Sequence, residues 1–246
     1  MYGSTVLLII ILISAIPVIA VYIWYRLAKY NISNIQFLFM LLAGAAALFP
    51  ALILQNILII PNFLHGRPEL FYEFFIRIAF TEELSRFSIL TVFFLIPAYK
   101  RSGSSLTLNN QDDLQSDENQ AAGQSRKAAA AGLVAGLGFA LLENAAYAAS
   151  DLRVLPLRII ITAAVHGACG SRIGTAAAMI RLNPIQAILR ILTATAIHGI
   201  YNLMINMPGF SPVLAILIAL SALLTSISTI TNGFSKTAID KNTENS

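Results

Sequence analysis

The sequence predicts an all-α, polytopic membrane protein with about seven transmembrane helices. Of its 246 residues, 57% are hydrophobic and only 11% are charged, whereas a soluble domain carries about 25% charged residues. The apolar runs exceed 18 residues, long enough to span a bilayer as helices, and they lack the alternation of barrel strands. The composition therefore excludes a soluble globular protein. The net charge of +4 is not interpreted as a nucleic-acid-binding surface, because the basic residues gather near the ends of the apolar runs.

The first apolar segment is predicted to be a retained helix and not a cleaved signal peptide. It has no basic stretch before it, its apolar run is too long, and Arg26 and Lys29 follow it. Hydrophobicity places seven helices, in chain order, at Ser4 to Tyr25, Ile35 to Ile60, Ile76 to Tyr99, Ala128 to Ala149, Leu157 to Ile180, Ile185 to Met207, and Pro212 to Thr231. We expect them to form a single transmembrane helical domain over residues 1–235.

Two polar stretches interrupt or follow these helices. Residues 100–127, rich in Ser, Asn, Gln and Asp, are predicted to be a flexible cytoplasmic loop with no core of its own. Residues 236–246 are predicted to be a mobile polar tail. No internal repeat is evident, which disfavours a transporter built from inverted repeats.

The distribution of basic residues predicts the orientation in the cell membrane. Cytoplasmic loops carry an excess of Lys and Arg. With alternating helices, three basic residues fall on one side: Arg67, Arg153 and Arg158. Ten fall on the other: Arg26, Lys29, Lys100, Arg101, Arg126, Lys127, Arg181, Arg190, Lys236 and Lys241. We therefore expect the N-terminus outside and the C-terminus in the cytoplasm.

Four of the predicted helices carry polar groups at one depth of the membrane. These groups are Glu82 and Glu83 on the third helix, Glu143 and Asn144 on the fourth, His166 on the fifth, and His198 and Asn202 on the sixth. At about 1.5 Å per residue, all of them lie roughly 5 to 15 Å from the outer hydrocarbon boundary. The orientation came from basic residues alone, so the shared depth independently predicts a single polar site.

Each polar group also has a structural interpretation. Glu82 and Arg86, at i and i+4, could form a neutralised structural pair, but one arginine cannot neutralise both Glu82 and Glu83. Adjacent helix positions point about 100° apart, so the two carboxylates need separate partners. His198 and Asn202 share one helix face and could simply bond a neighbouring helix.

Small residues near these groups favour close helix packing. Cys169, three residues after His166, could be a ligand or a nucleophile, although a small buried thiol is the more common role. Gly132 and Gly136 form a small-xxx-small face typical of helix packing. The Gly- and Ala-rich faces of the fourth and fifth helices could alternatively leave a groove for a substrate.

The polar set matches the requirements of peptide-bond hydrolysis. A carboxylate in an apolar site can act as general base and then as acid, and His or Asn side chains can stabilise an oxyanion. Two glutamates and two histidines, Glu83, Glu143, His166 and His198, could instead bind Zn²⁺. Neither GxSxG nor HExxH occurs, which disfavours a serine nucleophile or a helix-borne zinc motif. The residues leave both mechanisms open.

Four ordered motifs resemble those of the PrsW intramembrane proteases, relatives of the CAAX prenyl protease and bacteriocin-processing enzymes. The motifs are EELSR from Glu82, FALLEN ending in Asn144, the His166 segment, and HGIYN from His198 to Asn202. Two positions depart from the pattern. Arg86 stands where the family usually has lysine, and Asn202 matches the prenyl-protease branch. The resemblance implies catalytic Glu82, Glu83, Glu143, His166, His198 and Asn202, with Arg86 and Asn144 supporting them.

In this interpretation Glu82 activates the water and Glu83 positions it, with the reverse assignment left open. The resemblance further implies a single-pass, membrane-anchored substrate, similar to an anti-sigma factor, that is cut near the extracytoplasmic face. Zn²⁺ is the candidate cofactor, and membrane lipid rather than nucleic acid surrounds the protein. The main alternative is a proton- or ion-coupled transporter that uses the Glu and His residues as a relay. A third is a catalytically inactive scaffold that binds membrane partners.

Overall fold

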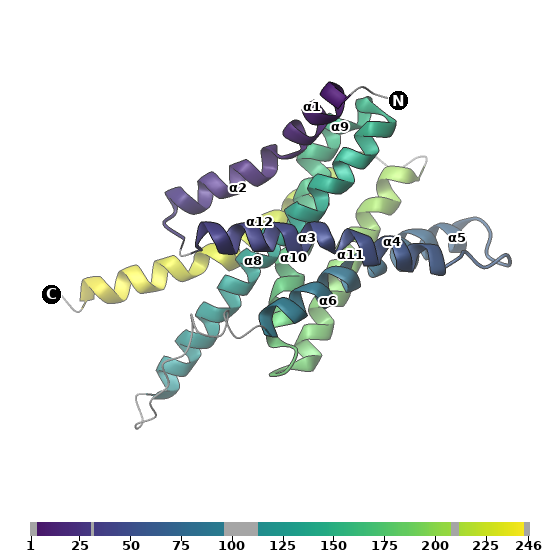
Figure 1. Cartoon of the computed structure of the whole chain (residues 1–246). Helices are drawn as coiled ribbons and strands as arrows, with labels where there is room; N and C mark the ends of the chain where they lie inside the picture. The colour runs from purple at the N-terminus through teal and green to yellow at the C-terminus, as the bar shows by residue number, and fades with distance from the viewer. Residues whose placement is uncertain (1–3, 31, 96–112, 208–211, 244–246) are drawn as a thin grey trace.

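The structure is a computed structural model that describes residues 4–30, 32–95, 113–207 and 212–243. Every regular element in these ranges is helical, as the sequence predicted. The elements are α1 (Ser4–Ser14), α2 (Ile16–Leu27), α3 (Asn34–Ala46), α4 (Leu48–Ile57), α5 (Arg67–Phe71), the π-helix η1 (Tyr72–Phe80), α6 (Thr81–Leu95), α8 (Asp113–Ser150), the 3-10 turn η2 (Leu152–Val154), α9 (Leu155–Leu157), the π-helix η3 (Arg158–Thr162), α10 (Ala163–Met179), α11 (Pro184–Asn206) and α12 (Pro212–Thr243) (Figure 1).

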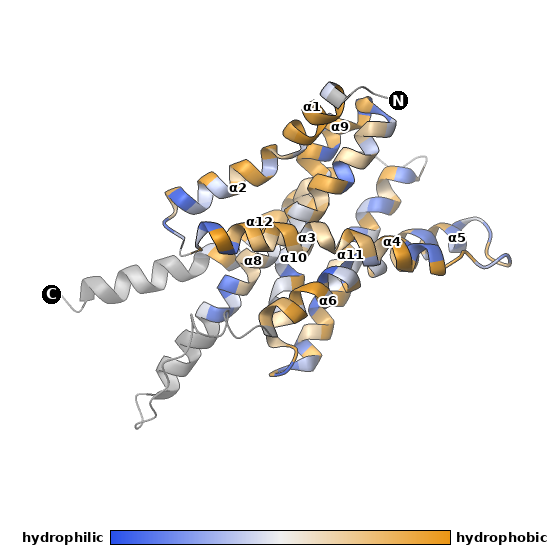
Figure 2. Ribbon diagram, viewed as in Figure 1, coloured by the Kyte–Doolittle hydropathy of each residue, from blue (hydrophilic) through white to orange (hydrophobic). Residues whose placement is uncertain are grey.

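Six stretches of helix in the described ranges are long and apolar enough to cross a membrane. They are Thr5–Leu27, Asn34–Ile57, Gly123–Ser150, Leu152–Met179, Pro184–Asn206 and Val213–Thr231. They correspond to six of the seven predicted helices, and the chain is an integral membrane protein. Hydrophobic residues dominate α1 to α4 (Figure 2), and many of their large apolar side chains are exposed, as a lipid-facing surface requires.

The remaining predicted helix, Ile76 to Tyr99, is the third in chain order. It corresponds to the end of η1 and to α6, and it is described as far as Leu95. It does not qualify as a spanning helix by composition, because Glu82, Glu83 and Arg86 interrupt its apolar run. This segment packs against α3, α4, α10 and α11. Its charges are therefore held inside the protein and away from lipid.

The predicted loop at residues 100–127 is helical over much of its length. Helix α8 begins at Asp113, so only residues 100–112 of that stretch lie outside the described ranges. The segment that follows Asp113 is polar, but it lacks proline and contains several Gln and Ala residues, which are good helix formers. The tail is also helical as far as Thr243, where α12 ends. A polar composition was therefore a poor guide to backbone conformation here.

Local sequence explains where several helices begin and break. Pro17 follows the break between α1 and α2, and Pro50 follows the break between α3 and α4. Proline lacks an N–H donor and clashes with the preceding turn of a helix. Ser33 starts α3 with a capping box that includes Gln36. Asn183 caps α11 by accepting a hydrogen bond from the backbone N–H of Gln186.

Helix α10 is the centre of the bundle and is buried along nearly its whole length. It packs most extensively against α8, and also against α6, α11 and α12. Glycines permit the close approach of α8. A Cβ atom on Gly136 would overlap the carbonyl group of His166, and one on Gly132 would lie 2.8 Å from the Cα atom of Gly174. The glycine faces are thus filled by helix packing, and the predicted substrate groove between these two faces is absent from the described structure.

Two tyrosines near the end of α2 tie it to α8. Tyr25 donates a hydrogen bond to the carbonyl of Ala130 at 2.9 Å, and Tyr30 donates one to the carbonyl of Arg126 at 3.2 Å. The end of α2 and the beginning of the apolar part of α8 therefore lie at the same end of the bundle. The alternation of helices had placed these two chain segments on one side of the membrane.

Candidate active site

Helix α6 supplies two adjacent glutamates with different partners. The π-helix η1 ends at Phe80 and α6 begins at Thr81, so Glu82 and Glu83 fall in the first turn of α6. Both side chains are buried. Glu83 forms an ion pair with Arg86 one turn later on the same helix. Glu82 instead accepts a hydrogen bond from the side-chain amide of Gln55 on α4, at 3.1 Å. The expected divergence of the two carboxylates is confirmed.

Each histidine of the site is held by a carboxylate from another helix. His198 on α11 donates from Nδ1 to Oε1 of Glu83 at 2.9 Å. His166 on α10 bonds through Nε2 to Oε2 of Glu143 on α8, at 2.7 Å. A carboxylate bound to one ring nitrogen fixes the tautomer and the orientation of the imidazole. In both histidines the other nitrogen therefore presents its lone pair.

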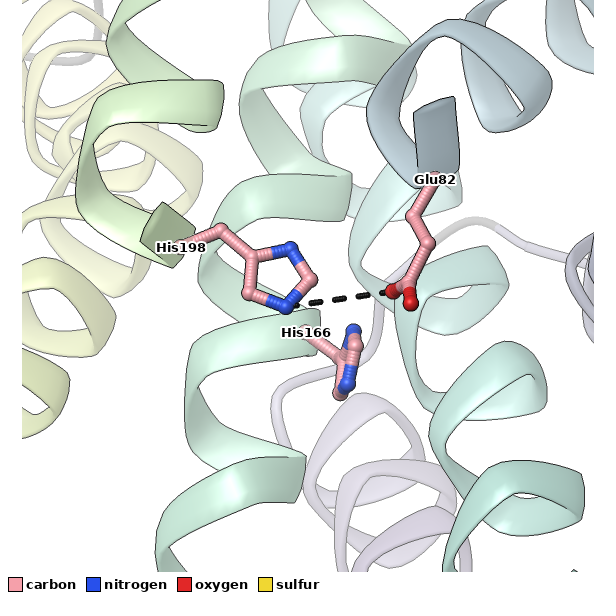
Figure 3. A group of neighbouring side chains, drawn as sticks. All are labelled: Glu82, His166 and His198. Carbon is pink, nitrogen blue, oxygen red and sulfur yellow. Dashed lines mark ion pairs between the residues drawn. The ribbon is translucent and has the colours of Figure 1, made fainter. Parts of the chain in front are cut away.

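Glu82, His166 and His198 converge on one point, as Figure 3 shows. One ligand atom of each lies within 4.8 Å of those of the other two, and all three residues are buried. The Nε2 atom of His198 is 3.8 Å from Oε2 of Glu82, and the two imidazole rings are nearly perpendicular with centroids 4.9 Å apart. Neither Oε2 of Glu82 nor Nδ1 of His166 has a hydrogen-bond partner among the described residues, although both atoms are buried.

This arrangement suits a divalent cation. Two imidazoles and one carboxylate form the ligand set of many catalytic zinc sites, where a water molecule occupies the fourth position. Buried polar atoms without partners are uncommon in folded proteins and call for an explanation such as an ion or a water molecule. Glu83 and Glu143 occupy the supporting positions behind the two histidines. The three side chains therefore fit a metal ion, and the carboxylates of Glu83 and Glu143 orient the two histidine ligands.

Glu143 is joined to the beginning of the fifth predicted helix by Arg158. Arg158, on η3, forms an ion pair with Oε2 of Glu143 at 2.9 Å and donates from Nε to Oδ1 of Asn144 at 3.0 Å. Asn144 in turn donates to the carbonyl of Arg158 at 3.2 Å. The guanidinium also lies over the ring of Tyr147, 3.8 Å from its centroid. Asn144 thus contacts the cluster through Arg158, and its supporting role stays a prediction.

Arg86 is fully buried and connects three helices. Besides its pair with Glu83, it donates from Nη1 to the carbonyl of His166 at 3.2 Å. Its guanidinium lies over the ring of Phe139 on α8, 4.8 Å from the centroid. The pairing of Arg86 is with Glu83 at i−3 and not with Glu82 at i−4, because Glu82 points toward α4.

The structure gathers five of the six predicted catalytic side chains into this cluster: Glu82, Glu83, Glu143, His166 and His198. Asn202 lies one turn beyond His198 and is partly buried. Among the described residues, no hydrogen bond joins its side chain to the cluster, and its carbonyl accepts a bond from Asn206. Cys169 is a buried thiol that donates to the carbonyl of Ala194, which agrees with the structural interpretation of this residue.

The grouping of ligands differs from the predicted metal set of Glu83, Glu143, His166 and His198. The structure retains both histidines but brings Glu82 to them as the third ligand. Sequence reasoning also missed Gln55 and counted Arg158 only as a basic residue of an outer loop. A glutamine inside the apolar run ALILQNILII was a signal for the former. For Arg158 the sequence held no such signal, because nothing in it distinguishes this arginine from an ordinary basic residue at a membrane boundary.

The fold and the cluster define an integral membrane protein with a buried carboxylate–imidazole centre of the kind that hydrolases use. Residues 34–227 match the PrsW-protease family, the PrsW family intramembrane metalloproteases. The match covers more than half of the chain and includes every residue of the cluster, so the chain belongs to this family. Comparisons with curated proteins and with solved structures found no match. The chain is therefore an intramembrane protease by family, as its motifs indicated.

Proposed function

We propose that this protease hydrolyses a peptide bond of a single-pass membrane protein at the point where Glu82, His166 and His198 meet. The observation that carries the proposal is the convergence of these buried side chains from α6, α10 and α11, with ligand atoms within 4.8 Å of one another. Family membership supports proteolysis over the alternative of an ion-coupled transporter.

Glu82, His166 and His198 would hold a divalent cation such as Zn²⁺. When bound, such an ion lowers the pKa of a water molecule and polarises the substrate carbonyl. Residues around the site fix the orientation of the two histidines. Glu83 holds His198 and is itself neutralised by Arg86, while Glu143 holds His166 in the same way.

A second mechanism uses Glu82 without a metal ion, as the base that takes a proton from water. It is favoured by one specific contrast among the carboxylates. Glu83 and Glu143 are each paired with an arginine, whereas the hydrogen-bond partner of Glu82 is the neutral amide of Gln55. Oε2 of Glu82 has no hydrogen-bond partner, so this oxygen is free to accept the proton. In this mechanism Glu83 is the positioning partner, the role suggested for it from the sequence, and it acts through its hydrogen bond with His198.

The substrate would be cut near the extracytoplasmic face, and an anti-sigma-factor-like protein is the proposed type. Support comes from the distribution of basic residues, which predicts an N-terminus outside and a site in the outer half of the membrane. Accessible cysteines test this orientation with little background, because the native thiol of Cys169 is buried. Arg153 and Leu182 are exposed, and they lie at the beginning and just beyond the end of the candidate spanning stretch Leu152–Met179. An impermeant maleimide should label Arg153→Cys in intact cells and Leu182→Cys only after lysis; the reverse pattern would invert the orientation.

The protease function is tested by comparing new protein termini in membranes of cells that express the wild type or Glu82→Gln. This substitution keeps the shape of the side chain and removes its charge. The matched control is Glu69→Gln, on α5 and outside the cluster. We expect specific single-pass proteins to lose an extracytoplasmic cut only in Glu82→Gln. Unchanged termini in an abundant, folded Glu82→Gln variant would refute the proposal.

The metal dependence is tested on purified protein with a substrate found in that comparison. Chelation should abolish cleavage, and added Zn²⁺ should restore it. Full activity in protein shown to be free of metal would establish the second mechanism, in which Glu82 acts as the base.

A further inference from the structure

We propose that Gln55 is a positioning residue that aims the carboxylate of Glu82 at the two histidines. This inference rests on the proposed function, because it assigns Gln55 a role in the site formed by Glu82, His166 and His198. Gln55 lies in the last turn of α4, on an element that contributes no other residue to the cluster. Its side-chain amide is the hydrogen-bond donor to Glu82, at 3.1 Å.

The hydrogen bond from Gln55 distinguishes the two oxygens of Glu82. Oε1 accepts the amide N–H of Gln55, and Oε2 has no hydrogen-bond partner and faces Nε2 of His198 at 3.8 Å. Because Oε1 is held on the α4 side, the carboxylate cannot rotate freely about its last bond. Gln55 thereby leaves Oε2 as the oxygen presented to a ligand. A side chain held in this way meets a cation with little loss of rotamer freedom.

The position of Gln55 is fixed by a hydrogen bond to its backbone carbonyl. Its carbonyl is one of the last four of α4, which have no partner within a helix. Arg77 on η1 donates from Nε to this carbonyl at 3.0 Å, and its Nη1 pairs with Glu73 at 2.6 Å. The end of α4 is therefore fastened to the π-helix that leads directly into Glu82. This connection holds the donor and the acceptor at a constant separation.

The neighbouring Asn56 offers a matched control. It carries the same amide group one position along α4, but it is exposed and donates to the carbonyl of Leu52 on its own helix. Changes at Asn56 alter the polarity of α4 without touching Glu82. If Gln55 acts only by stabilising α4, substitutions at both positions should have similar effects on the site.

The test measures Zn²⁺ affinity of the full-length, detergent-purified chain by competition with a chromophoric chelator. We expect Gln55→Met to weaken Zn²⁺ binding by about 10- to 100-fold, the usual effect of removing a partner behind a metal ligand. Gln55→Asn, whose amide is one methylene too short to reach Glu82, should weaken it similarly and guards against a folding defect in the first variant. Asn56→Leu should bind like the wild type.

A double-mutant cycle separates positioning from a structural role. In a Glu82→Ala background the remaining histidines bind Zn²⁺ weakly, and Gln55→Met should then cause no further loss, because its effect passes through Glu82. An undiminished additional loss would overturn the proposal. So would wild-type Zn²⁺ affinity in Gln55→Met or Gln55→Asn, or an absence of Zn²⁺ binding by the wild type. The terminus comparison with Glu82→Gln reports on proteolysis separately, so failure of the inference about Gln55 is distinguishable from failure of the proposed function.

Discussion

Replacing Arg86 with methionine should strongly destabilise the protein, because it strands the buried carboxylate of Glu83. Both side chains of the Arg86–Glu83 pair are fully buried. Removing one member of a buried pair leaves an uncompensated charge and costs about 3–5 kcal/mol. Arg86→Lys keeps the charge but cannot span both Glu83 and the carbonyl of His166. We expect it to lose one charge-assisted hydrogen bond, worth about 1.5–3 kcal/mol.

The assay is equilibrium unfolding in mixed detergent, followed by circular dichroism. The double variant Glu83→Gln with Arg86→Met should recover much of the lost stability, because the stranded carboxylate is then absent. Arg153→Met is the control, since that arginine pairs with Asp151 at an exposed position and should leave the unfolding free energy unchanged. The reasoning is refuted if Arg86→Met is no less stable than Arg86→Lys, or if Glu83→Gln fails to rescue it.

Three further outcomes are expected. Gly136→Leu should push α8 away from the carbonyl of His166 and lower the unfolding free energy by about 1–3 kcal/mol or more. Gly123→Leu is the control and should leave the unfolding free energy unchanged, because the space around its Cβ position is open. Equal effects of the two variants would contradict the packing of α8 on α10. Arg158→Met removes the cation from Glu143 and should reduce the cleavage rate by about 10- to 100-fold, measured as initial rates on an identified substrate; an unaltered rate would show that the ion pair is dispensable. Zn²⁺ should raise the thermal unfolding temperature of the metal-free protein in a concentration-dependent way. At the same Zn²⁺ concentration the shift should be much smaller in Glu82→Ala, and an equal shift would show that Glu82 is not a ligand.

The composition of the chain was sufficient to predict its class and most of its helices. Long apolar runs and few charges admit only helices in a bilayer, because every backbone polar group there must be satisfied within the segment. Where composition and conformation are less tightly linked, prediction failed. The stretch after Asp113 is polar, yet it forms part of α8, since polarity does not prevent a helix made of good helix formers.

The sequence by itself singled out five ionisable residues that the structure brings together, because ionisable groups inside apolar helices are costly. Glu82, Glu83, Glu143, His166 and His198 all stood out on this ground. Only the tertiary structure decided which carboxylate serves which histidine. Such pairing depends on helix rotation and on contacts between α6, α8, α10 and α11, and sequence spacing within one helix does not encode these. For the same reason Gln55 entered the site only when α4 was seen to pack beside α6.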